Sequence, residues 1–186
     1  SNRSQIDPKS SSNQSQIERQ LSSASQLDTP AGPVDDGELF IEVIGMDGVE
    51  MLHSEQIYID LVEELRIARL LKREDSYRIQ VTLELPTSQG FGMSAAGLVA
   101  VARAFRALSN KGTDEQYLRL AHRIERMHGS GLGDVLGISA QGVELRLEPG
   151  APGAGGKVVS FTTHQPILLV WKPEESRHTS TYIDDG

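Results

Sequence analysis

The chain has 186 residues, of which 38% are hydrophobic, and this is enough for one domain with a packed core. Its formal net charge of −8 argues against a broad nucleic-acid surface, which needs clustered Lys and Arg. It has no cysteine, which excludes disulfides and thiolate zinc sites. No apolar run approaches the roughly 18 residues of a membrane span, and the N-terminus lacks the apolar core of a signal peptide. We therefore expect a cytoplasmic protein with no membrane partner.

The N-terminal arm, residues 1–37, is low in complexity. It is rich in Ser, Gln and Asn, above all over residues 1–30, and has few large apolar side chains. Such a segment cannot bury enough surface to offset the entropy lost on ordering. We expect a disordered or irregular arm followed by one ordered domain over residues 38–186. The alternative is that the arm partly replaces a functional element.

The pattern after the arm predicts strands around an amphipathic helix. Residues 38–44 are strand-like, and a turn at 45–48 leads into a short return strand, which predicts a hairpin. Apolar side chains then recur every 3.6 residues, which predicts a helix up to residue 72 with Ser54 as its N-cap. Residues 77–85 alternate as a strand that ends before a proline.

The rest of the pattern predicts two helices and then three short strands. Thr113 followed three residues later by Gln116 is a capping box, which fixes the start of the second helix. The expected helices cover residues 94–108 and 113–128, and the expected strands cover 140–147, 158–161 and 166–171. Since strands and helices do not alternate strictly, a doubly wound parallel sheet is disfavoured and a mixed α+β layer is predicted.

A glycine-bearing loop connects the strand 77–85 to the next helix. Residues 90–97 read Gly-Phe-Gly-Met-Ser-Ala-Ala-Gly, and Ser94 is expected to open the helix. A flexible loop at a helix N-terminus can bind an anion, because unpaired N–H groups and the helix dipole favour negative charge there. The Ser94 hydroxyl can reach a phosphate oxygen or Mg²⁺. The alternative is that Gly and Ala only allow the strand and helix to pack closely.

A second glycine loop runs from His128 to Asp134. Its Gly-x-Gly-x-Gly run follows a helix rather than a strand, so a dinucleotide-binding fingerprint is excluded. Asp134 could orient or deprotonate an attacking hydroxyl, as phosphoryl transfer requires. The alternative is that Asp134 caps a helix that begins near Val135.

Glu125 lies near the end of the helix before this loop. The helix dipole disfavours a carboxylate at a helix C-terminus, so a cation such as Mg²⁺ is one expected partner. An ion pair with Arg123, Arg126 or His122 is the other.

Together these residues resemble the GHMP kinase superfamily, which includes galactokinase, homoserine kinase and mevalonate kinase. The run from Pro86 to Gly97 looks like the second motif of that superfamily, and residues 125–134 resemble its glutamate, glycine loop and aspartate. The motifs are most similar to those of the archaeal pantoate kinases, whose Pro-Gly-Ala-Pro sequence recurs here at residues 149–152. The resemblance covers roughly residues 38–183. It implies an α+β fold with a mixed sheet and helices on one side, as in the GHMP kinase N-terminal domain (ribosomal protein S5 domain 2-like).

The resemblance also implies an activity and its residues. Enzymes of this kind transfer the γ-phosphoryl group of ATP to a small-molecule hydroxyl, here pantoate to 4-phosphopantoate in coenzyme A biosynthesis. Asp134 would be the base or orienting group, and Ser94 and Glu125 would hold Mg²⁺. The ATP phosphates would lie against Gly90, Phe91, Gly92, Met93, Ser94, Ala95 and Ala96. No nucleic-acid partner is expected, and a homodimer is an open possibility.

The chain departs from the family pattern at both ends. No motif in residues 1–37 matches the opening Pro-Gly-containing strand, and the second domain with its third glycine-rich motif is expected to be absent. A non-catalytic or truncated domain that serves as a binding or assembly module is therefore an alternative. A sibling kinase with another acceptor is a third hypothesis, with Arg177, His178 and Thr179 as candidates to meet a carboxylate.

Overall fold

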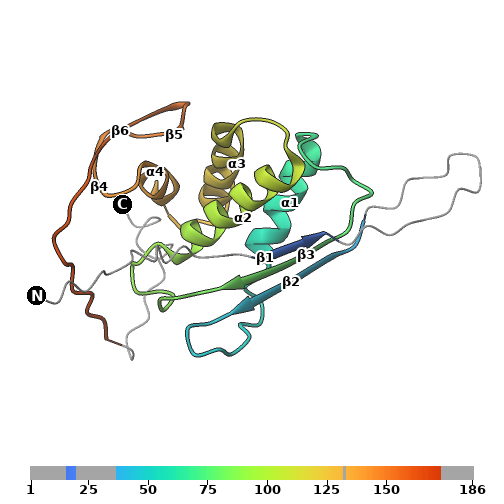
Figure 1. The fold of residues 1–186 in the computed structure, drawn as a ribbon, viewed down its shortest axis with the longest axis horizontal. Coiled ribbons are helices and arrows are strands. Elements are labelled where there is room, and N and C mark those ends of the chain that lie inside the picture. Colours follow the sequence, from blue (N-terminus) through green and yellow to red (C-terminus); the bar gives the residue numbers. More distant parts are fainter. Residues whose placement is uncertain (1–15, 20–36, 132, 173–186) are drawn as a thin grey trace, which may run out of the picture.

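The computed structural model describes residues 16–19, 37–131 and 133–172. Its elements in chain order are β1 (Gln16–Arg19), β2 (Leu39–Ile44), α1 (Gln56–Ile67), β3 (Tyr77–Thr82), α2 (Met93–Ser109), α3 (Asp114–Met127), α4 (Asp134–Ala140), β4 (Val143–Glu148), β5 (Ala151–Pro152) and β6 (Gly155–Phe161). Helices cover one face of a mixed sheet, as Figure 1 shows. The predicted α+β fold is confirmed.

The first sheet has the strand order β1-β3-β2. β2 runs parallel to β3, with Leu39 opposite Tyr77, and β1 runs antiparallel to β3 on its other side. Part of the N-terminal arm thus lies on the domain as a strand. In β3 the buried residues Tyr77, Ile79 and Val81 alternate with more exposed ones, so the strand buries one face under the helices.

The helices form the apolar core with this sheet. α1 and α2 contact the strands, and α3 packs against α1 and α2. The core side chains with no exposed surface are Leu61, Val62, Leu65, Ile79, Leu98, Val101, Ala102, Phe105, Tyr117, Ala121, Ile124 and Val135. The capping box of α3 is confirmed, because the Thr113 hydroxyl accepts from the Gln116 N–H and the Gln116 side chain accepts from the Thr113 N–H. Among the described residues, no helix has the length and apolar character needed to cross a bilayer.

The first helix is shorter than the sequence pattern predicted. α1 begins after Glu55, which makes no side-chain cap, so Ser54 is not the N-cap. The helix stops at Ile67 instead of reaching Lys72, because Arg69 takes a left-handed conformation with φ 58°. The N–H of Leu70 then bonds back to the Leu65 carbonyl, which closes the helix end.

Two predicted strands differ as well. The return strand of the hairpin is reduced to one bridge between Ile44 and Glu50. Residues 166–171 are not a strand, and within the described part of the chain no strand pairs with them. β-propensity predicts a strand only where a partner is available.

The second sheet has the order β4-β6-β5 and lies beside α4. β4 begins at Val143 rather than near residue 140, because Ala140 ends α4. Gln141 and Gly142 then follow with φ of 63° and 71°, a left-handed turn that separates helix from strand.

Candidate active site

The first glycine loop joins β3 to α2. Gly90 and Gly92 both have left-handed backbone angles, with φ of 78° and 63°. Gly92 is the N-cap of α2, so no side chain at that position caps the helix, and Ser94 is the second helical residue rather than the cap. The first backbone N–H groups of this 17-residue helix therefore face the loop, and no side chain at position 92 accepts a hydrogen bond from them.

A cavity of about 470 Å³ lies against this loop. Five of the seven residues predicted to meet phosphate line it: Gly90, Phe91, Gly92, Met93 and Ser94. Ala95 and Ala96 lie further into α2 and do not line it. The wall also includes two histidines, His53 and His128, together with hydroxyl and apolar side chains, and among the described residues that line it there is no Lys or Arg.

The small residue Gly97 has a packing role. A Cβ atom at this position would collide with the hydroxyl of Tyr58, which comes from α1. Tyr58 is 3% exposed, and burial raises its pKa to about 12, so the hydroxyl stays protonated. The close-packing interpretation therefore holds for Gly97, while the residues before Ala95 remain open to the cavity.

The second glycine loop brings Asp134 to the first. A Cβ atom placed on Gly92 would lie 3.7 Å from the Asp134 carboxylate, so the two segments are in near contact. Asp134 lines the same cavity as Ser94, and its side chain is 39% exposed. It is the first residue of α4, with Gly133 as the N-cap, so it does not cap a helix that begins at Val135.

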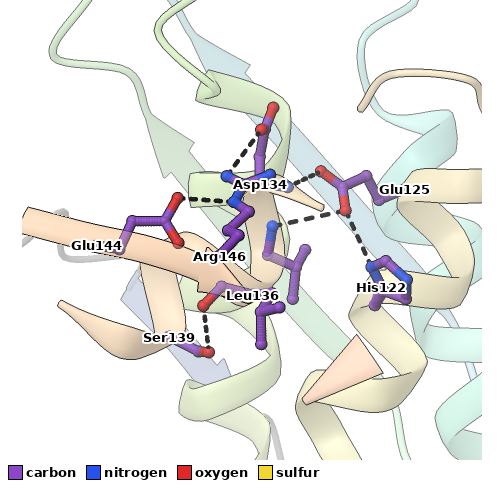
Figure 2. A network of polar contacts seen from close by, with 8 residues as sticks. His122, Glu125, Asp134, Leu136, Ser139, Glu144 and Arg146 are labelled. Atoms are coloured by element: carbon purple, nitrogen blue, oxygen red, sulfur yellow. Dashed lines mark hydrogen bonds and ion pairs between the residues drawn. The ribbon is translucent and has the colours of Figure 1, made fainter. Parts of the chain in front are cut away.

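Glu125 performs that capping function instead. Its carboxylate is fully buried near the end of α3 and accepts the N–H of Asp134 at 3.2 Å and, weakly, that of Val135 at 3.5 Å. Figure 2 shows this carboxylate between α4 and the ring of His122, whose Nδ1 lies 3.2 Å from Oε2. Burial first, and then the charge of Asp134, raise the pKa of Glu125 to about 7. Of the expected ion-pair partners, His122 is the one in contact, and Arg123 pairs with Glu64.

Arg146 joins this cluster from β4. Its guanidinium lies 2.7 Å from Glu144 and 3.6 Å from Asp134. Figure 2 shows it between these two carboxylates. A Cβ atom on Gly133 or on Gly137 would come within 3.0 Å of the guanidinium nitrogens, so both glycines leave room for it. Arg146 and Asp134 line a second cavity of about 360 Å³, which shares Gly90, Phe91 and Gly92 with the first.

Sequence reasoning missed Arg146 and Glu144. A signal was available, because alternation along residues 143–148 places them on the strand face opposite Val143, Leu145 and Leu147. The sequence did not reveal that this polar face turns toward Asp134. The candidates Arg177, His178 and Thr179 lie outside the described residues.

The fit of Mg²⁺ differs between its two predicted ligands. Ser94 lines the cavity together with Asp134, and hydroxyl and carboxylate oxygens suit this ion, which usually keeps waters and substrate phosphates as further ligands. Glu125 is buried with its oxygens on N–H groups, so it would have to exchange those bonds for a metal. The described residues contain no cluster of three or more His, Cys, Asp or Glu side chains suited to a metal.

The geometry agrees with the comparison to known families. Residues 60–142, which include both glycine loops, match the model of the GHMP kinases N terminal domain. Over this range the chain is similar to GHMP kinases. The resemblance predicted from the two motifs is confirmed.

Individual relatives of this chain include pantoate kinases. The chain is 43% identical over 87 residues to the pantoate kinase of Thermococcus kodakarensis, a match that covers 47% of this chain and 29% of that protein. It is 33% identical over 105 residues to the pantoate kinase of Methanospirillum hungatei, covering 56% and 34%. A solved structure described as a phosphotransferase related to the CoA biosynthesis pathway superposes with a TM-score of 0.57 at 27% identity, covering 81% of this chain and 44% of that one. The chain thus spans about a third of the length of these curated relatives.

Proposed function

We propose that this domain binds ATP and serves in the phosphorylation of a small-molecule hydroxyl, with pantoate as the first candidate acceptor. The observation that carries the proposal is the near contact of Asp134 with Gly92, because it sets a carboxylate beside an anion-binding loop. The similarity to two pantoate kinases supports the choice of acceptor.

In this proposal the loop holds the phosphates. The N–H groups at the start of α2 and the Ser94 hydroxyl donate hydrogen bonds to phosphate oxygens, and Ala95 and Ala96 add no bulk at the helix start. Among the described residues no Lys or Arg lines this cavity, and in this proposal the backbone dipoles of the loop and a bound cation would neutralise charge there. Mg²⁺, held by Ser94 and a carboxylate, would neutralise charge that develops on the phosphates. Glu125 can be that carboxylate only if it gives up its hydrogen bonds from the N–H groups of Asp134 and Val135.

Asp134 then acts on the acceptor. Its carboxylate accepts the hydroxyl proton while the hydroxyl oxygen bonds to the γ-phosphorus and ADP departs with the electron pair of the broken bond. Glu125 holds Asp134 in place through the backbone, since it accepts the Asp134 N–H. Arg146 presents further donors in the adjoining cavity, where the carboxylate of a hydroxy acid such as pantoate fits a guanidinium.

The experiment is ADP release by the 186-residue chain with Mg·ATP and pantoate, mevalonate or homoserine in turn. We expect pantoate to stimulate release and Asp134→Asn to abolish it. Stimulation by another acceptor instead would assign a sibling kinase. No stimulation by any of the three, together with no rise in melting temperature on adding Mg·ATP, would refute the kinase proposal for this chain. Partner binding that survives in Asp134→Asn would then favour a binding or assembly module.

A further inference from the structure

The segment that follows β6 returns to the first glycine loop. Within residues 162–172, Ile167, Leu168 and Val170 are 73%, 87% and 78% exposed, whereas Trp171 is 37% exposed. The Trp171 ring meets the Phe91 ring edge to face, with centroids 6.1 Å apart and an interplanar angle of 88°. In Figure 1 this orange-red segment descends past the end of the sheet at which the β3–α2 loop lies. Trp171 is therefore a point at which this exposed segment touches the domain.

Phe91 is a large side chain of that loop, and it packs partly buried against the apolar core. It lies between Gly90 and Gly92, both with positive φ, and it lines both cavities. A Cβ atom on Gly90 would have no atom within 4 Å, so packing around Gly90 does not hold the loop. Glycine-flanked backbone loses much entropy on ordering, and a contact through the Phe91 ring offsets part of that loss.

We propose that Trp171 is a positioning residue of the phosphate loop. Its ring holds Phe91, and through Phe91 it keeps the backbone of Gly90 and Gly92 in the conformation that lines the cavity. The inference rests on the proposed function, in which this loop binds the phosphate chain of a nucleotide. A loop ordered before the ligand arrives binds a polyphosphate more tightly, because less ordering remains to be done on binding.

The first test measures the loop itself and needs no ligand. Amide hydrogen exchange of the peptide spanning residues 87–94 is compared in the 186-residue chain and in Trp171→Ala, Trp171→Phe and Leu168→Ala. We expect exchange about three- to tenfold faster in Trp171→Ala, near wild-type exchange in Trp171→Phe, which keeps a ring, and no change in Leu168→Ala. Peptides of α3 should exchange equally in all four proteins. Unchanged loop exchange in Trp171→Ala would overturn the proposal, and so would equal acceleration in Leu168→Ala.

The second test uses the fact that the chain has a single tryptophan. Phe91→Ala should shift Trp171 emission to the red, because the ring loses its partner and gains water, and an unshifted spectrum would contradict the contact. Calorimetric titration with Mg·ATP and with tripolyphosphate should give about three- to tenfold weaker binding in Trp171→Ala and wild-type affinity in Leu168→Ala. Equal affinities of the wild type and Trp171→Ala would refute the role of Trp171 in ligand binding.

The two proposals fail in different ways. If the wild-type chain binds neither Mg·ATP nor tripolyphosphate, the proposed function and the phosphate role of this loop both fail. Loop exchange then still decides whether Trp171 holds Phe91. If the wild-type chain binds and Trp171→Ala binds equally well with unchanged loop exchange, the proposed function stands and the role of Trp171 fails.

Discussion

Replacing Glu125 with Gln should change how the stability of the domain depends on pH. The Glu125 pKa rises from its ordinary value of 4.5 to about 7 in the folded chain, because the carboxyl group is buried and faces Asp134. The folded state therefore binds a proton more tightly than the unfolded state. The contribution of Glu125 to the free energy of unfolding is fully present below pH 4.5 and is lost as the pH rises through about 7.

The size of the effect follows from the same values. A pKa that rises from 4.5 to about 7 on folding corresponds to about 3 kcal/mol of unfolding free energy. Gln keeps an oxygen that accepts the N–H of Asp134 and has no proton to lose in this range. We expect Glu125→Gln to be about as stable as wild type at pH 4.5 and more stable at pH 8, by an amount on the order of 3 kcal/mol.

The assay is urea unfolding of both proteins at pH 4.5, 6, 7 and 8, in EDTA so that no metal can bind. The difference between the two curves reports on Glu125 together with His122, whose Nδ1 lies 3.2 Å from the Glu125 carboxylate. Parallel curves would refute the account of Glu125 as a buried cap with a raised pKa. Adding Mg²⁺ at pH 8 gives a second readout, since stabilisation of the wild type alone would identify Glu125 as a metal ligand.

Four further changes test other parts of the site. Asp134→Asn should lower phosphoryl transfer by about 10²-fold or more and leave ATP affinity within a few-fold, measured by ADP release and calorimetry. Gly92→Ala should cost about 1 kcal/mol of stability in urea unfolding, because φ is 63° there, and should weaken tripolyphosphate binding. Arg146→Ala should raise KM for the acceptor more than KM for ATP, and equal rises would contradict its placement at the acceptor. Thr113→Ala should cost about 1 kcal/mol through loss of the capping box, with turnover unchanged.

The sequence predicted those parts of the site that depend on local patterns. The two glycine loops, the capping box at Thr113 and the position of Asp134 are all signalled within about ten residues of chain. The boundaries of α2 and α3 were close to those observed for the same reason. The predicted ends of the first helix, at Ser54 and Lys72, were wrong: the N-cap is Glu55, and a left-handed Arg69 follows the end of the helix at Ile67.

The remaining features depend on contacts between distant segments. Arg146 reaches Asp134 only because β4 pairs with β6 beside α4, and no local pattern states that arrangement. For the Glu125 carboxylate the sequence offered Mg²⁺ or an ion pair with Arg123, Arg126 or His122. The structure places His122 in contact and adds the N–H groups of Asp134 and Val135, which local sequence does not reveal. The expected strand at residues 166–171 is not observed. A strand needs a neighbouring strand to pair with, and the local sequence pattern does not show whether one is present.

The most direct test of the central claim is detection of the phosphorylated product. The 186-residue chain is incubated with Mg·ATP and pantoate, and the mixture is followed by ³¹P NMR beside the same mixture with Asp134→Asn. The proposed function predicts a phosphomonoester resonance that grows with ADP, requires pantoate and is absent with Asp134→Asn. An equal rate of product formation by Asp134→Asn, or calorimetric ATP binding with no product from pantoate, mevalonate or homoserine, would contradict the claim that Asp134 and the phosphate loop form a kinase centre.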